Sequence, residues 1–292
     1  MVNSHKDMWS QWLLHRRFGG DRSAMQEALT KFLYPIRDKV LSHANLGEGE
    51  TLLDVGCGDG LIAFGALEKV DASRVIFSDI SQDLLDHSQA LARQMNLLER
   101  CQFLNASADD LATITDATMD VVTTRSVLIY VSAKRPAFNE FHRVLKPGGR
   151  LSIFEPINRF AFPEPVGRFL GYDVKPIIEI AEKLEALYQS IQPTDTDPMT
   201  DFDERDLVRF AEQAGFKEIH LELQIAIKPS EGGDWEKLIN VAANPKIPTL
   251  AEAIHQVLTR AERETFINYL RPLVEARQGV RRSAVVYLWA VK

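Results

Sequence analysis

Three glycines, Gly56, Gly58 and Gly60, alternate with other residues in the stretch LLDVGCGDG. Glycine has no Cβ atom, so a loop of this composition can turn tightly and approach a ligand closely. The apolar residues before the loop are typical of a buried strand, and those after it of a helix. The pattern therefore indicates either a simple tight turn or a loop that binds a nucleotide-like ligand at the end of a strand.

The spacing of the glycines narrows the choice of ligand. A dinucleotide-binding loop follows G-x-G-x-x-G, but here Leu61 occupies the third glycine position. The pattern G-x-x-x-x-G-K-[ST] of triphosphate-binding loops is absent from the sequence. Asp59 would repel a pyrophosphate at short range. Asp54 and Asp59 instead favour a ligand with a cationic or amino group and few phosphates.

Another acid, Asp79, ends the apolar stretch RVIFSD. A carboxylate at such a strand end can accept hydrogen bonds from both hydroxyl groups of a ribose. Taken alone, Asp79 could also cap the helix that follows. Together with the glycine loop, it favours a ligand that contains a ribose.

Short apolar runs alternate with amphipathic stretches from Thr51 onward, which predicts a parallel sheet with helices on both faces. Helical spacing also predicts helices before residue 46, where Pro35 could kink the chain. Ser81 is expected to cap a helix. The predicted strands are 51–55, 74–80, 101–107, 119–127, 150–156, 216–227 and 281–292; the later helices are 60–70, 81–99, 134–145, 175–191, 203–215, 249–261 and 263–276.

Several stretches resemble motifs of the class I S-adenosylmethionine-dependent methyltransferases: LLDVGCGDG, FSDIS, NASADDL before MDVVTTRSVLIYV, and FHRVLKPGGRLSIFEP. The first and last are specific when they occur together. The resemblance covers residues 50–156 closely and 203–226 more loosely. It implies an α/β, Rossmann-like sheet of seven strands with helices on both faces. Its last strand, AVVYLWAVK here, would run antiparallel between strands five and six.

The resemblance implies that S-adenosylmethionine is the methyl donor and S-adenosylhomocysteine the product. By position, the glycine loop would line the methionine part, Asp79 would bind the ribose and Ile80 would pack on the adenine. Many relatives have GDA where this chain has ASA, so Ser107, Asp109 or the backbone must meet the adenine amino group. The residues expected to bind the donor are Asp54, Gly56, Gly58, Gly60, Asp79, Ile80, Ser107, Ala108, Asp109 and Arg125.

The sequence shows no clear catalytic residue. Methyl transfer by in-line attack depends on proximity and orientation, and it needs a base only when the acceptor must lose a proton early. Three residues are weak candidates: His15 in the N-terminal segment, Arg125 after the fourth strand and Glu155 at the end of the fifth. Each could instead have an ordinary structural role at a helix start or in a loop.

Two segments interrupt the alternation of strands and helices. We expect an N-terminal helical lid at 1–46 and a methyltransferase domain at 47–292, with helical insertions after strands five and six at about 157–200 and 229–278. The insertions are expected to cover the strand ends and enclose a pocket for a small organic molecule. The aromatic stretch RFAFPEPVGRFLGYDV could line this pocket or form a small core within the insertion.

Composition excludes some classes of partner. The 292-residue chain has a net charge of −7, which argues against a nucleic-acid partner. Its 2 cysteines are too few for a disulfide framework and favour a cytoplasmic location. No apolar run is long enough to span a membrane, so no membrane partner is expected. The histidine spacing predicts no metal site, and a monomer or a homodimer is expected.

The methyl acceptor stays open at this stage. The leading hypothesis is an enzyme that methylates O, N or C of a small organic molecule. The alternatives are a methyltransferase that acts on protein or RNA, and a non-catalytic scaffold protein that binds the cofactor. A nicotinamide-dependent oxidoreductase is disfavoured by Leu61 at the third glycine position.

Overall fold

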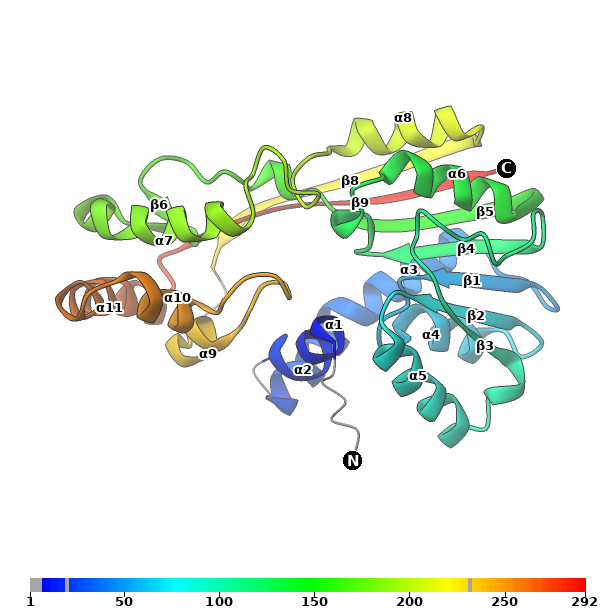
Figure 1. Cartoon of the computed structure of the whole chain (residues 1–292), viewed down its shortest axis with the longest axis horizontal. Coiled ribbons are helices and arrows are strands. Elements are labelled where there is room, and N and C mark those ends of the chain that lie inside the picture. Colours follow the sequence, from blue (N-terminus) through cyan, green and yellow to red (C-terminus); the bar gives the residue numbers. More distant parts are fainter. Residues whose placement is uncertain (1–6, 19–20, 231–232) are drawn as a thin grey trace.

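The computed structural model describes residues 7–18, 21–230 and 233–292 (Figure 1). Its main sheet has seven strands in the order β3-β2-β1-β4-β5-β9-β8. The strands are β1 (Thr51–Val55), β2 (Arg74–Asp79), β3 (Cys101–Asn105), β4 (Met119–Arg125), β5 (Leu145–Pro156), β8 (Lys217–Pro229) and β9 (Val280–Val291). The first five strands are parallel, so their carboxyl ends lie along one edge of the sheet.

The last strand, β9, runs antiparallel between β5 and β8. Trp289 pairs with Ser152 on one side and with His220 on the other. The expected seven-stranded, Rossmann-like sheet is therefore confirmed, including the position of its last strand. β5 begins earlier than expected, at Leu145, because Gly148 and Gly149 exchange backbone hydrogen bonds with Lys292 at the end of β9.

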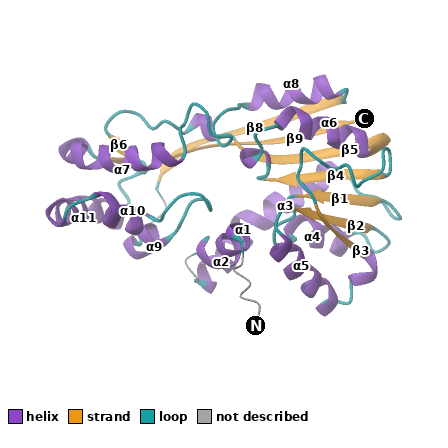
Figure 2. Ribbon diagram, in the orientation of Figure 1, coloured by secondary structure: helices purple, strands orange, loops and turns teal. Residues whose placement is uncertain are grey.

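Helices cover both faces of the sheet, as expected (Figure 2). One face packs against α3 (Tyr34–Ala44), α4 (Leu61–Lys69) and α5 (Gln82–Gln94), and the other against α6 (Lys134–Val144) and α8 (Glu204–Ala214). The helix α5 begins as predicted, since the Ser81 hydroxyl accepts a hydrogen bond from the Leu84 N–H at 3.1 Å. Short 3₁₀ turns complete this half of the chain: η3 (Leu98–Arg100), η4 (Leu128–Tyr130) and η5 (Asn158–Phe160).

The N-terminal helices lie against the strand ends of this sheet (Figure 1). They are α1 (Met8–Gln11), η1 (Trp12–Arg16), α2 (Arg22–Ala28) and η2 (Leu29–Leu33), followed by α3. Both η1 and η2 are π-helical turns. Pro35 follows η2 in the first turn of α3; proline has no N–H and its ring crowds the preceding turn, so a wider turn accommodates it. Of the predicted lid 1–46, residues 1–6 and 19–20 lie outside the described residues.

The two insertions pack together into one helical unit, although α8 and β8 separate them in the sequence (Figure 1). The unit contains β6 (Arg168–Phe169), β7 (Tyr172–Asp173), η6 (Lys175–Ile177), α7 (Ile178–Ile191), α9 (Trp235–Asn240), α10 (Leu250–Val257) and α11 (Arg260–Glu275). Leu184, Phe266 and Leu270 are fully buried in its core. The sequence patterns predicted α7, α10 and α11 but missed the short helix α9.

The strands β8 and β9 connect this unit to the sheet. β5 pairs with β9 only as far as Val285, whereas β8 continues to pair with β9 as far as Val280. The second insertion thus begins and ends at the tip of a two-stranded ribbon. No helix within the described ranges is long and apolar enough to cross a bilayer.

Candidate active site

A cavity of about 680 Å³ lies beside the carboxyl ends of β1, β2 and β4. Segments far apart in the sequence supply its wall. The lining residues are Trp9, Trp12, Leu13, Arg17 and Phe18 from the N-terminal helices; Gly56, Gly58, Asp79, Ile80, Leu84, Ala106, Ser107, Ala108 and Asp109 from β1, β2 and the segments after β1, β2 and β3; Arg125, Ser126, Val127, Ile129, Tyr130, Val131, Ser132 and Ala133 from β4 and the segment after it; and Pro156, Asn158, Met199, Val241, Ala242 and Ala243.

Two glycines of the predicted loop border this cavity, and their backbone requires glycine. Gly56 and Gly58 have φ angles of +65° and +57°, a region that residues with a Cβ atom rarely adopt. A Cβ atom at Gly56 would lie 2.4 Å from Cγ2 of Val127. The loop therefore keeps its backbone exposed to the cavity, as the sequence pattern predicts.

Asp79 lies at the end of β2 and is almost fully buried, yet it borders the cavity. Its Oδ1 accepts a hydrogen bond from the Ser81 N–H at 2.9 Å, and its Oδ2 accepts one from the Gly58 N–H at 2.8 Å. Each carboxylate oxygen can accept a further bond, so two ribose hydroxyls could still be bound. Burial raises the pKa of Asp79 above its ordinary value.

The side chains next to Asp79 offer an apolar surface and polar groups for a flat ring. Ile80 is 52% exposed, an unusual exposure for isoleucine, and it lines the cavity. Ser107, Ala108 and Asp109 line the same cavity. The Ser107 hydroxyl donates a hydrogen bond to the Asp109 carboxylate. The structure thus brings Asp79, Ile80 and the stretch after β3 together around one space.

Asp54 and Gly60 lie behind this surface and are not among the residues that line the cavity. The carboxylate of Asp54 is 2% exposed and accepts hydrogen bonds from the Thr123 hydroxyl at 2.9 Å and the Ala63 N–H at 3.2 Å. Burial raises its pKa to about 7. Gly60 has a φ of +83°, and a Cβ there would meet the ring of Phe64 at 2.5 Å. These contacts tie β1 to α4 and to β4.

Arg125 lies at the end of β4 and lines the cavity, as does Arg17 of the N-terminal segment. Burial lowers the pKa of Arg17, and the nearby charge of Arg125 lowers it further. Tyr130 lies near both, and burial raises its pKa to about 12. The rings of Tyr130 and Trp9 meet edge to face with their centroids 4.8 Å apart. This end of the cavity is therefore aromatic and cationic.

The N-terminal helices are anchored to the sheet half of the chain through α5. The Ser81 hydroxyl donates to Oδ2 of Asp7 at 2.6 Å, and the Asp7 N–H donates to Oδ2 of Asp83 at 2.7 Å. The Ser10 hydroxyl also donates to Asp83. The Asp7 carboxylate in turn caps α1 through the N–H groups of Trp9 and Ser10.

The same helices contact the helical unit. The Trp12 indole N–H donates to the carbonyl of Ala242 at 2.9 Å, and Arg16 forms an ion pair with Glu252 of α10 at 2.8 Å. The N-terminal segment thus bridges the sheet and the helical unit over the cavity.

Two of the weak catalytic candidates do not line the cavity. His15 is exposed on η1. Glu155 is fully buried in β5, and its carboxylate accepts hydrogen bonds from the N–H groups of Val127, Leu128 and Ile129 at 2.8, 2.9 and 3.3 Å. Burial raises its pKa to about 7. Glu155 thus holds the start of η4, the turn that carries Tyr130. Arg125 is the candidate that the structure places at the cavity.

The sequence analysis did not identify the lid residues that line the cavity. Trp9, Trp12, Arg17 and Phe18 carried no distinguishing motif. A signal existed, since three aromatic side chains and two arginines gather within 8–18. Which face of the segment meets the cavity depends on its contacts with Asp83 and Ala242, and no local pattern reveals those.

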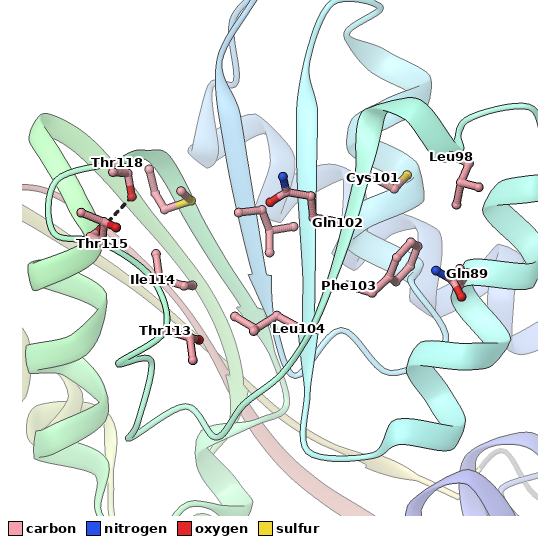
Figure 3. Close-up of a pocket in the computed structure, with 12 residues that line it drawn as sticks. Gln89, Leu98, Cys101, Gln102, Phe103, Leu104, Thr113, Ile114, Thr115 and Thr118 are labelled. Carbon is pink, nitrogen blue, oxygen red and sulfur yellow. Dashed lines mark hydrogen bonds between the residues drawn. The ribbon is translucent and has the colours of Figure 1, made fainter.

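A second cavity, of about 600 Å³, lies beside the edge strand β3 (Figure 3). Gln102 and Leu104 of the edge strand β3 line it, as do Gln89 of α5 and Thr113 and Thr118 of the segment before β4. It includes no residue of the glycine loop. Within the described part of the chain, no group of three or more His, Cys, Asp and Glu side chains is arranged to hold a metal ion.

The first cavity fits S-adenosylmethionine in its chemistry. Asp79 retains acceptor capacity for a ribose, Ile80 offers an exposed apolar surface to an adenine, and the glycine loop presents bare backbone to the remainder. The expected acid at the adenine edge is replaced by the hydrogen-bonded pair Ser107 and Asp109. Both side chains lie in the stretch after β3, where the sequence departs from the GDA motif of many relatives.

Comparison with known proteins agrees with this arrangement. Residues 52–149 match the family model of a methyltransferase domain. The ubiquinone/menaquinone biosynthesis C-methyltransferase UbiE of Enterobacter sp. (strain 638) is 32% identical over 108 residues, which are 37% of this chain and 43% of that protein. The tRNA 5-carboxymethoxyuridine methyltransferase of Escherichia coli (strain K12) is 28% identical over 137 residues, 47% of this chain and 50% of that protein. The chain spans about half the length of the curated relatives it matches.

Solved structures share the fold over most of the chain. The geranyl diphosphate C-methyltransferase of Streptomyces coelicolor A3(2), solved with Mg²⁺, geranyl diphosphate and S-adenosylhomocysteine, matches with a TM-score of 0.53. The match covers 94% of this chain and 88% of that one at 16% identity, so it concerns the fold alone. Residues 52–149 thus match a methyltransferase domain, and the strand order is the one expected from the resemblance to the class I S-adenosylmethionine-dependent methyltransferases.

Proposed function

We propose that this chain transfers the methyl group of S-adenosylmethionine to an O, N or C atom of a small organic molecule. The observation that carries the proposal is the cavity, in which the surface formed by Gly56, Gly58 and Asp79 continues into an aromatic wall. A volume of about 680 Å³ is typical of a small-ligand site. The N-terminal helices and the segment 241–243 supply part of the cavity wall, which favours a small acceptor over a macromolecule.

In this proposal the donor supplies a methyl group on a positively charged sulfur, and the protein supplies the position. Asp79 would hold the ribose, Ile80 would pack on the adenine, and Ser107 and Asp109 would meet the adenine edge. Gly56 and Gly58 would allow the methionine part to approach the backbone. Asp54 and Gly60 would act indirectly, since they fix the loop from behind through Thr123, Ala63 and Phe64.

Catalysis would come mainly from orientation of the acceptor against the methyl group. Glu155 is a positioning residue in this account, because its carboxylate fixes the backbone of η4 and so the place of Tyr130. Tyr130 and Arg125 both border the cavity and are the groups best placed to contact an acceptor. His15 has no part in this account, since it does not line the cavity.

An RNA acceptor is the second candidate, because one relative is named as a tRNA methyltransferase. The net charge of −7 disfavours it, since nucleic-acid binding depends on cationic contacts to phosphates. The bridge of the N-terminal helices across the cavity also disfavours a large acceptor.

Calorimetric titration with S-adenosylmethionine, S-adenosylhomocysteine and NAD tests the donor part of the proposal. We expect the first two to bind with micromolar affinity and NAD not to bind. Binding of NAD alone, or of none of the three, would contradict it. The acceptor part is tested by incubating the protein and radiolabelled donor with a small-molecule extract and, separately, with total tRNA. Label transferred only to tRNA would support the second candidate instead.

A further inference from the structure

Two positive charges occupy one end of the cavity without an ion-pair partner. Arg17 and Arg125 both line it, and among the described residues no carboxylate lies within ion-pair distance of either. Arg17 packs against aromatic rings, with its guanidinium carbon 5.5 Å from the ring centre of Trp12 and 5.3 Å from that of Phe18. By contrast, Lys134 and Arg150 have carboxylate partners, and Arg100 donates to backbone carbonyls.

The arrangement is electrostatically unfavourable when the cavity holds no anion. Burial and the charge of Arg125 lower the pKa of Arg17 to about 10, and Asp59 offsets this only in part. Two like charges in a partly desolvated space repel each other and lose hydration. Such a pair is stabilised most directly by an anion bound between the two groups.

The methyl donor cannot balance both charges. S-adenosylmethionine carries one carboxylate, one ammonium and one sulfonium group, so its net charge is positive. Its carboxylate could neutralise only one of the two positive charges. The acids that line the cavity, Asp79 and Asp109, lie around the expected nucleoside part and are held by Gly58, Ser81 and Ser107. A second negative charge must therefore come from the other ligand.

The rest of this end of the cavity is apolar. Apart from the two arginines, Ser126, Ser132 and Asn158, the lining side chains outside the expected donor surface are apolar or aromatic, among them Trp9, Ile129, Val131 and Met199, and the segment 241–243 adds small apolar side chains. A ligand that fits both features has an apolar body and one negative group.

We infer that the methyl acceptor is a small organic anion with an apolar body, whose carboxylate or phosphate group binds at Arg17 and Arg125. The inference rests on the proposed function and deepens it. It assigns these two residues to recognition of the acceptor rather than to the chemical step.

The test uses the protein saturated with S-adenosylhomocysteine and three matched pairs of probes: benzoate and benzamide, phenylacetate and phenylacetamide, and 3-phenylpropanoate and 3-phenylpropanamide. The two members of each pair have nearly the same shape, but only the acid carries a negative charge. In calorimetric titrations we expect at least one acid to bind about tenfold more tightly than its amide. Phenyl phosphate, titrated in the same way, distinguishes a phosphate site from a carboxylate site by which anion binds more tightly.

Variants show which residues cause the preference for the acid over its amide. Arg17→Gln or Arg125→Gln should reduce the preference for the acid over its amide to less than about threefold. At least one of these variants should do so while S-adenosylhomocysteine still binds as in the wild type. Arg22→Gln, an exposed change in α2, is the matched control and should leave the preference intact. Equal binding of acid and amide in all three pairs, or no binding of any acid, would overturn the inference. So would a preference that survives in both variants, or loss of S-adenosylhomocysteine binding in both.

The result is separable from the proposed function. If wild-type protein does not bind S-adenosylhomocysteine, the proposed function fails first and the inference falls with it. If it binds S-adenosylhomocysteine but shows no preference for the acids, only the inference fails.

Discussion

The glycine-loop side of the cavity and the helical unit contribute to it in different ways. The loop side is built by β1, β2 and the short segments that follow the strands. The backbone geometry of these segments and their buried acids fix the positions of the residues that border the cavity. The helical unit is built around its own core, and the insertions that form it give the cavity Asn158, Met199 and the segment 241–243. One side is defined by local sequence, and the other by how distant segments pack.

The difference suggests that the two regions can be disturbed separately. Buried side chains such as Phe266 stabilise the helical unit and do not line the cavity, whereas Asp79 borders the cavity and its carboxylate accepts hydrogen bonds from Gly58 of the loop and from Ser81. A change in the helical unit should therefore leave ligand binding at the loop side intact. A change at the loop side should leave the stability of the helical unit intact. The predictions below test that separation, beginning with the largest expected effect.

Phe266→Ala should give the largest effect. Phe266 is fully buried among Phe169, Leu270 and other core residues of the helical unit, so truncation leaves a cavity. We expect a loss of about 3–5 kcal/mol in the unfolding free energy of this unit, measured by urea denaturation. Binding of S-adenosylhomocysteine should change less than about threefold.

Val166→Ala is the control, because Val166 lies in the same insertion and is 91% exposed. It should change stability by less than about 0.5 kcal/mol. A tenfold or greater loss of S-adenosylhomocysteine binding in Phe266→Ala would show that the helical unit and the loop side are one cooperative structure.

Much of the sheet could be predicted because its signals are local. The apolar run of β2 and the capping residue Ser81 are legible within a few residues, and the motif around Leu145–Pro156 specifies a strand after a helix. The helix α9 and the π-helical turn before Pro35 could not be predicted in this way. Their form depends on packing against α10 and on how the chain accommodates a proline.

The candidate site divides along the same line. Gly56, Gly58, Asp79 and Ile80 border one cavity, because their places follow from the ends of two adjacent strands. Glu155 also follows a strand, but its side chain points to the backbone of η4, which no spacing rule reveals. The aromatic stretch after β5 formed the core of the helical unit, one of the two alternatives its composition allowed, with Phe169 and Tyr172 buried there.

The next largest effect is expected in the pH dependence of stability, to which Glu155 contributes. Its pKa in the folded protein is raised to about 7 from an ordinary value of 4.5, mainly by burial. Such a group stabilises the fold below its ordinary pKa, and this contribution is lost as the pH rises towards about 7. From pH 5 to pH 8 we expect wild-type protein to lose about 2 kcal/mol through this group.

Glu155→Gln should remove that part of the pH dependence, because the amide cannot ionise. The measurement is urea denaturation at both pH values for wild type and variant. Glu99→Gln, an exposed change beside β3, is the control and should leave the slope unchanged. An identical slope in wild type and Glu155→Gln would show that Glu155 is already ionised at pH 5.

Asp79→Asn should affect the donor side alone. The amide keeps one oxygen acceptor but loses the charge and one acceptor for the ribose, so S-adenosylhomocysteine should bind more than about tenfold more weakly. Asp71→Asn, an exposed change in the turn before β2, is the control in the same calorimetric titration. Unchanged affinity in Asp79→Asn would remove the assignment of Asp79 to the ribose.

The smallest effect is expected where the N-terminal helices meet the helical unit. Arg16 and Glu252 form an exposed ion pair with side chains 41% and 55% accessible, and such pairs contribute little. Arg16→Gln should therefore change the unfolding free energy by less than about 0.5 kcal/mol, as should Arg260→Gln, which removes an exposed ion pair within α11. The anchors on Asp83 and Ser81 are shorter and partly buried, so they should hold the lid without Arg16. If hydrogen exchange over 8–16 quickens in Arg16→Gln but not in Arg260→Gln, the helical unit does hold the lid, and the two regions are coupled through it.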